Sequence, residues 1–172
     1  MNIQSLRFLL GVRFLTFFCF FSFITSTFSQ QTGFILAKNF LAIESTQETI
    51  ENQTTYTSSK SLIEDLHPSV YLENGIVKMY GSNPKCLFVD TVSNLINVSN
   101  SFTKDYIEIV TIKIHTVSEL SQPIDLSIFY EYPALRIIYV VVPFECTENQ
   151  LNSFIQNQTT NYHLVYTIVN PS

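Results

Sequence analysis

The C-terminal half of the chain alternates strand-like and helix-like stretches, and this alternation limits the fold more than any other feature. β-branched and aromatic residues concentrate in four segments, 86–90, 106–114, 135–142 and 162–169. The third segment is apolar at nearly every position, which is typical of a strand covered on both faces, as in a parallel sheet. The gaps hold apolar triplets at i, i+3, i+4 that predict short helices: Val92/Leu95/Ile96, Leu126/Phe129/Tyr130 and Leu151/Phe154/Ile155.

Two of these helices begin at recognisable capping residues. Asp125 is a candidate N-cap for the middle helix. Thr147 and Gln150 have the spacing of a capping box at the start of the last one. A strand followed by a helix and a second parallel strand is the βα unit. We therefore predict a small α/β fold whose sheet is mainly parallel and built from strand–helix units.

A β-hairpin is expected over residues 70–80, ahead of these units. Two strand-like runs there flank Asn74-Gly75. This pair is favoured in two-residue type I′ turns, because both central positions need a positive φ.

The segment 124–140 resembles the junction of a leucine-rich repeat. Leu126-Ser127-Ile128-Phe129 matches Leu-Ser-x-Phe, and Pro133-Ala134-Leu135 matches the Pro-x-Leu that leads into the next strand. The resemblance is confined to residues 106–169 and covers one good unit and two degraded ones, without the Asn or Cys that normally follows the strand. It implies stacked strand–helix repeats of twenty to thirty residues. The alternative is an unrelated small α/β sheet with similar unit lengths.

Residues 1–29 have the pattern of a secretory signal peptide. Two arginines accompany an apolar core of 11 residues, Phe14–Ile24, and Thr27 and Ser29 supply small side chains at positions −3 and −1. The core is too short for a bilayer of about 30 Å, although an uncleaved anchor is the alternative. We therefore expect an exported protein, periplasmic or secreted, with no transmembrane segment in the mature chain.

Removal of this segment makes the remainder more acidic. It leaves seven basic and 14 acidic residues, a formal net charge of −7. Nucleic-acid binding needs clustered Lys and Arg, so it is excluded as a function class. Residues 30–66 are largely polar and predict an N-terminal tether with a short helix, and residues 67–172 are expected to form the α/β domain.

The cysteines and glycosylation sequons depend on the compartment. Cys86 and Cys146 could form a disulfide in an oxidising environment. Two separate thiols are the alternative, because parallel strands would place them at opposite rims. Asn52, Asn97 and Asn157 begin Asn-x-Ser/Thr sequons, which a eukaryotic host would glycosylate. Residue usage favours a bacterial source, in which these sequons would arise by chance.

Catalytic and cofactor motifs are not found in the sequence. No two histidines are spaced i, i+4, and there is no Cys-x-x-Cys, Gly-x-Ser-x-Gly or phosphate-binding glycine loop, so neither metal nor cofactor is predicted. Asp105 and Glu108 are expected to point to solvent. A hydrolase with a site at the strand ends, around His115, Cys146 and His163, is the alternative function.

Tyrosines in the last two strands suggest a binding surface instead. If Tyr139 and Tyr166 stand opposite one another on adjacent strands, both rings lie on one face, although core packing is the alternative. We favour a non-catalytic interaction or structural protein of the cell envelope or extracellular space, with a protein or glycan partner. A further alternative is a subunit whose edge strand, residues 162–169, pairs with a partner.

Overall fold

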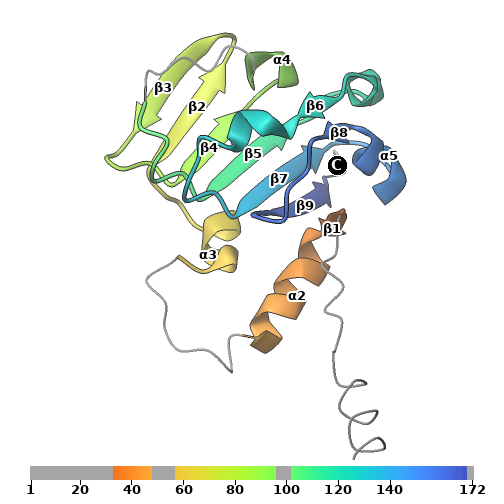
Figure 1. Cartoon of the computed structure of the whole chain (residues 1–172), viewed down its shortest axis with the longest axis horizontal. Coiled ribbons are helices and arrows are strands. Elements are labelled where there is room, and N and C mark those ends of the chain that lie inside the picture. The colour runs from red at the N-terminus through yellow and green to blue at the C-terminus, as the bar shows by residue number, and fades with distance from the viewer. Residues whose placement is uncertain (1–32, 48–56, 96–101, 170–172) are drawn as a thin grey trace, which may run out of the picture. The chain divides into compact units, whose positions relative to one another are not determined.

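Seven strands form one sheet in the order β1-β9-β7-β5-β4-β2-β3 (Figure 1). The computed structural model describes residues 33–47, 57–95 and 102–169. The chain divides into units of residues 1–31 and 32–172, and every described residue belongs to the second. The strands are β1 (Phe34–Leu36), β2 (Ser69–Glu73), β3 (Ile76–Tyr80), β4 (Cys86–Val89), β5 (Ile109–Lys113), β7 (Ile137–Val142) and β9 (His163–Ile168).

Apart from the edge strand β3, strand order in the sheet follows chain order from β2 to β9. β4 pairs in parallel with β2, and β5, β7 and β9 each pair in parallel with the strand of this sheet that precedes them in the chain. The chain reaches β1 at the far edge, where it pairs in parallel with β9. The predicted α/β class with a mainly parallel sheet is therefore confirmed. β9 lies between β7 and β1, so the expectation that residues 162–169 form an uncovered edge is wrong.

β2 and β3 are the one antiparallel pair of the seven-stranded sheet. The connection between them is Asn74-Gly75, with φ values of 52° and 75°. β3 continues the same sheet and forms its edge, so this pair is not a separate element ahead of the parallel strands.

Short helices and turns connect the strands. They are α2 (Ala37–Gln47), α3 (Ser59–Glu64), α4 (Val92–Leu95), α5 (Glu148–Ser153) and two 3₁₀ helices, η1 (Val117–Ser121) and η2 (Leu126–Phe129). β6 (Ile124–Asp125) and β8 (Ile155–Gln156) form a second, two-stranded parallel sheet. The Thr147 capping box and the Asp125 cap are both present, the latter accepting a hydrogen bond from Ser127 N–H. The middle helix is only a 3₁₀ turn of four residues, and Pro133 lies among the eleven residues between Asp125 and β7.

One face of the sheet is covered along the strands, and we call it the helical face. Its inward side chains, such as Leu87, Val110 and Val140, are at most 1% exposed. They pack against Leu126 of η2 and Leu151 of α5 in one continuous hydrophobic cluster. This layer is the main core of the described chain.

The opposite face is covered only near the strand starts (Figure 1). There Ala37 and Phe40 of α2 and Leu62 of α3 pack against Cys86 and Ile109, the first residues of β4 and β5. On this face, the side chains farther along β4 and β5, such as Phe88, Thr111 and Lys113, are half-buried or exposed. This leaves the carboxyl-terminal part of the face without a covering helix in the described ranges.

Residues 33–47 and 57–66, which lie in the range that the sequence assigns to a polar tether, contribute to the sheet and its covering. β1 extends the sheet beside β9, and α2 and α3 pack on its face. Phe34, Phe40 and Leu62 are all at most 4% exposed. A few well-spaced apolar anchors therefore dock an otherwise polar sequence. None of the helices in the described ranges has the length and hydropathy needed to cross a membrane.

Candidate functional site: the open face of the sheet

The uncovered half-face carries two rows of side chains. Residues paired directly across a sheet point to the same side, so the strand register places Tyr71, Phe88, Thr111 and Tyr139 in one row. The second row lies two residues farther along each strand. It contains Glu73, Asp90, Lys113 and Val141. We call these eight residues the open face.

Aromatic rings form one end of the first row. The rings of Tyr71 and Phe88 stack with centroids 4.7 Å apart and planes at 14°. Tyr80 of β3 meets Tyr71 edge-on, with centroids 5.4 Å apart at 89°. Such contacts hold the rings in place, and Tyr71 and Phe88 are both half-buried.

The second row carries charges of both signs. Glu73 accepts from Lys78 Nζ at 2.8 Å, and Asp90 Oδ1 lies 3.1 Å from His115 Nε2. Both acidic side chains therefore have a partner from this chain. Lys113 is exposed, and no acidic side chain in the described ranges pairs with it. The open face thus offers an ammonium group beside an aromatic and aliphatic floor.

The surface between the rows is hollowed but open. A hollow of about 250 Å³ lies between Phe88, Asp90, Lys113 and Val141. A neighbouring hollow of about 350 Å³ reaches Leu66 and Tyr80, and both hollows share Tyr71 and Glu73. Small-molecule sites are usually deeper and enclose most of the ligand. This shape accommodates side chains or sugar rings from a larger partner.

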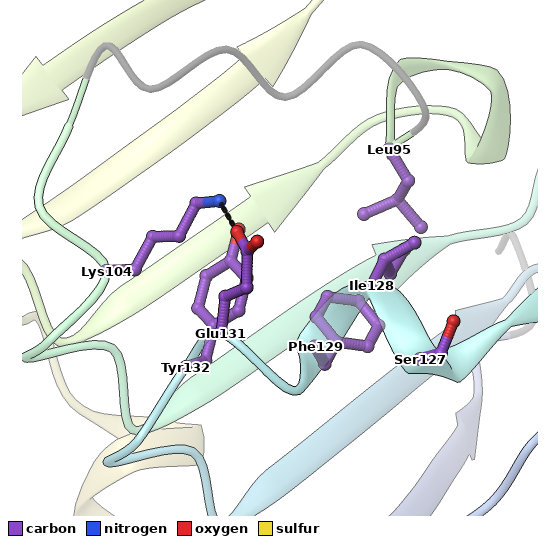
Figure 2. Close-up of a pocket in the computed structure, with 7 residues that line it drawn as sticks. All are labelled: Leu95, Lys104, Ser127, Ile128, Phe129, Glu131 and Tyr132. Carbon is purple, nitrogen blue, oxygen red and sulfur yellow. Dashed lines mark hydrogen bonds and ion pairs between the residues drawn. The ribbon is translucent and has the colours of Figure 1, made fainter.

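A third hollow, of about 220 Å³, lies within the layer on the helical face (Figure 2). Figure 2 shows the Lys104 side chain pointing to Glu131, and Lys104 Nζ lies 2.5 Å from Glu131 Oε2. Lys104 Nζ also lies 5.4 Å from the centre of the Tyr132 ring. The hydrogen bond from Lys104 lowers the pKa of Glu131. The charged groups of this hollow are thus already paired with one another, which makes it the weaker candidate.

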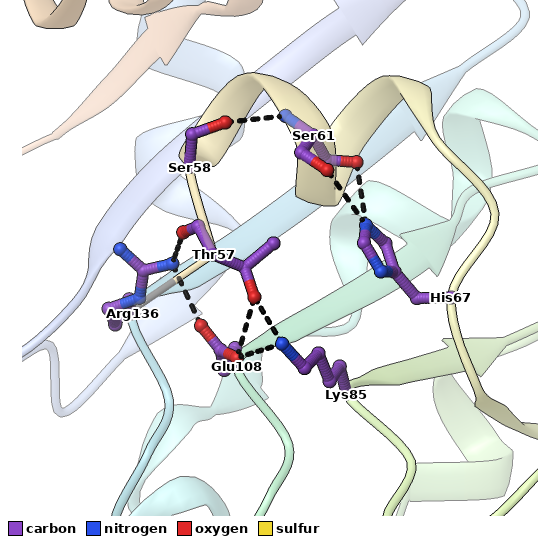
Figure 3. Close-up of polar contacts among 7 residues, drawn as sticks. All are labelled: Thr57, Ser58, Ser61, His67, Lys85, Glu108 and Arg136. Carbon is purple, nitrogen blue, oxygen red and sulfur yellow. Dashed lines mark hydrogen bonds and ion pairs between the residues drawn. The ribbon is translucent and has the colours of Figure 1, made fainter. Parts of the chain in front are cut away.

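A buried polar cluster lies at the amino ends of the strands (Figure 3). Glu108 is 7% exposed, which corrects the expectation that it points to solvent. Its carboxylate lies 2.9 Å from Arg136 Nη2, 3.3 Å from Lys85 Nζ and 3.2 Å from Thr57 Oγ1. Arg136 and Lys85 also donate to Thr57. Since Thr57 immediately precedes the N-cap of α3, the cluster fixes that helix to the sheet.

The sequence contains a signal for this cluster. Lys85, Glu108 and Arg136 each immediately precede a strand. Backbone hydrogen bonds from Glu108 N to Lys85 O, and from Arg136 N to Glu108 O, place them on adjacent strands. Alternating charges at successive strand starts could therefore have predicted an ion-pair network.

Tyr139 and Tyr166 do not share a face, and the predicted register is wrong by one residue. Tyr139 pairs with Val165, and Val140 pairs with Tyr166. Because side chains alternate along a strand, this shift directs the two rings to opposite faces. Tyr139 belongs to the open face, whereas Tyr166 packs beside Phe34 in the helical-face core. Burial raises the pKa of both hydroxyls.

Cys86 and Cys146 are free thiols in this structure. Cys86 lies under α2 and α3, while Cys146 packs against the cluster on the helical face. The sheet therefore separates the two sulfur atoms. Burial raises the pKa of Cys86 to about 11, so it stays protonated at neutral pH.

The structure separates the two histidines of the alternative hydrolase site. His163 begins β9 and contacts the ring of Phe40, with centroids 5.1 Å apart. His115 follows the carboxyl end of β5 and meets Asp90. Because β5, β7 and β9 run in parallel, these histidines lie at opposite ends of the strands.

Of the three sequons, Asn157 lies within the described residues, and Asn52 and Asn97 lie outside them. Asn157 has a φ of 55°, and its amide donates to Asp125 Oδ1 at 2.9 Å. This hydrogen bond lowers the pKa of Asp125, the cap of η2. Asn157 thus has a structural role in the turn that follows β8.

In the described ranges, no group of three or more His, Cys, Asp and Glu residues is arranged to hold a metal ion. Comparisons with models of protein families, with curated proteins and with solved structures find no match for this chain.

Proposed function

We propose that this chain is an exported, non-catalytic interaction protein of the cell envelope or extracellular space. Its ligand would be a protein or glycan that docks on the open face. The observation that carries the proposal is the combination of the stacked Tyr71 and Phe88 with Lys113 on a sheet face without a covering helix in the described ranges. Aromatic residues are enriched at interfaces because they bury a large rigid area and keep a polar tip.

The chemistry of the face favours one class of ligand group. Glu73 is already paired with Lys78, and Asp90 already contacts His115, so Lys113 is the charge best placed to select a ligand. An ammonium group beside an apolar floor suits a carboxylate next to an apolar surface. An acidic peptide with an aliphatic or aromatic neighbour has this chemistry, and so does an acidic glycan.

The export part of the proposal depends on the signal-like pattern of residues 1–29. We also propose that residues 106–169 form repeat-like units, because they resemble leucine-rich repeats and because β5, β7 and β9 lie side by side in chain order. Repeat proteins of this kind commonly bind partners along an exposed sheet face. A hydrolase is less well supported, because His115 and His163 lie at opposite strand ends.

The proposal is tested by capture from the host's envelope fraction or medium. Lys113→Glu reverses the charge of an exposed residue on the open face and leaves the core intact. We expect it to abolish recovery of a ligand that the unmodified protein captures. Lys60→Glu, at a side chain 73% exposed on α3, is the matched control and should retain capture.

Equal recovery by the two variants would contradict the proposed site. Export is checked on the same host material by intact-mass analysis. The expected mass lacks residues 1–29.

A further inference from the structure

The sheet ends at β3 in a strand with unusual apolar exposure. Ile76, Met79 and Tyr80 are 58–59% exposed, and they are three of the nine large hydrophobic side chains exposed in the described ranges. All three belong to a strand of five residues. Leu66, which is fully exposed, lines the same hollow as Tyr80. Exposed apolar groups gathered in this way usually mark an interaction site.

The opposite edge of the sheet is protected, and the β3 edge is not. β1 is three residues long, and Phe34 N–H at that edge donates to Asn152 Oδ1 of α5 at 3.0 Å. β3 is longer, contains no proline and is followed by no covering helix in the described ranges. Alternate residues of an antiparallel edge strand direct their N–H and C=O groups away from their neighbour. Those groups form a template for another strand.

Lysine on an edge strand normally discourages pairing, but the charge of Lys78 is compensated. Its ammonium group lies 2.8 Å from Glu73 Oε2 on β2. The hydrogen bond to Glu73 raises the pKa of Lys78, so its ammonium group stays charged at neutral pH. The Lys78–Glu73 pair therefore adds no net charge to this edge, although the chain as a whole has a formal charge of −5. A second acidic chain can approach here without local repulsion.

We propose that β3 pairs antiparallel with β3 of a second copy of this chain. A two-fold axis at Met79 places the Met79 side chains of the two copies together and sets Lys78 of each copy opposite Tyr80 of the other. An axis at Lys78 would instead oppose two lysines, which is unfavourable across strands. The strand is thus complementary to itself, as a two-fold interface requires.

The pairing has a consequence for the whole assembly. A two-fold axis that relates antiparallel edge strands stands perpendicular to the sheet. Both copies therefore present their open faces on the same side. The inference does not depend on the proposed function, because pairing at β3 needs no ligand.

The test is the molar mass of the purified protein by analytical ultracentrifugation, in a concentration series extending to about 1 mM. We expect the mass to approach that of two chains. Met79→Lys places like charges at the axis and should keep the protein at the mass of one chain. Val117→Lys, at a residue 56% exposed on η1, is the control and should dimerise like the unmodified protein. The mass of one chain throughout, or an undisturbed dimer of the Met79→Lys variant, would overturn the proposal.

Disulfide trapping is a second test of the pairing, and it detects the dimer directly instead of its loss in a variant. In a Cys146→Ser background, Met79→Cys should form a cross-linked dimer under mild oxidation. Ile43→Cys, at a residue 47% exposed on α2, should not. Equal cross-linking at the two positions would show non-specific contact and would contradict pairing at β3.

Discussion

At the scale of single residues, Glu108 shows why a carboxylate is retained in a largely apolar setting. It is the buried acidic residue of the described ranges, and it joins Arg136, Lys85 and Thr57. Those partners lie immediately before β7, before β4 and before the N-cap of α3. One side chain therefore ties three separate parts of the chain together at the amino end of the sheet.

Glu108→Gln keeps the shape of the side chain and removes its charge. We expect the free energy of unfolding to fall by about 2 kcal/mol, since hydrogen bonds to charged groups are worth roughly that much. The loss is smaller than for a fully buried pair, because Lys85 and Arg136 are about one third exposed and can be hydrated. Urea denaturation measures the change.

Glu64→Gln is the control for this prediction. Its partner Lys60 lies 3.9 Å away and both side chains are more than half exposed. An exposed pair of this kind should change stability by less than about 0.5 kcal/mol. Equal losses in the two variants would contradict a structural role for the Glu108 cluster.

Burial of the Cys86 thiol should make the folded protein less stable at alkaline pH. Burial raises its pKa to about 11 in the folded chain, above the ordinary value of 9.0. The folded state therefore holds this proton more tightly than the unfolded state, and stability falls as pH rises from 9 toward 11. Cys86→Ala should flatten this part of a stability–pH curve measured by denaturation. An unchanged slope would show that Cys86 is not the titrating group.

At the scale of elements, strand and helix positions were readable because their signals are local. The long apolar run in β7 and the caps at Asp125 and Thr147 each depend on a few neighbouring residues. The one-residue error in pairing Tyr139 with Tyr166 arose because register depends on contacts between distant segments. The same limit hid β1, whose three residues become a strand only beside β9.

Gly75 and Gly81 flank β3, and their substitution distinguishes the cost of backbone strain from the cost of steric crowding. Gly75 and Gly81 have φ values of 75° and 82°, but only Gly81 would bring a Cβ within 2.9 Å of Pro68 Cβ. We expect Gly75→Ala to cost about 1 kcal/mol through its left-handed conformation. Gly81→Ala should cost more, because Pro68 must also move. Equal losses in thermal or urea unfolding would show that Pro68 does not constrain this turn.

At the scale of the whole molecule, the two faces of the sheet have different roles. The helical face buries a continuous core, whereas the helices that cover the other face in the described ranges are α2 and α3, near the strand starts. Composition identified an acidic chain with few charges, but it could not locate the open face. That location depends on where α2 and α3 end. The packing of these helices could not be predicted, because the sequence between residues 30 and 66 is largely polar.

The central claim is that ligands dock on the open face, and site-specific photo-crosslinking in the host tests it most directly. A photoreactive amino acid replaces Lys113 on the open face in one protein, and Val117 of η1 in another. Both positions are exposed and lie four residues apart in sequence. We predict a discrete covalent adduct from position 113 and none from position 117. An adduct from position 117 alone, or equal adducts from both, would contradict the account.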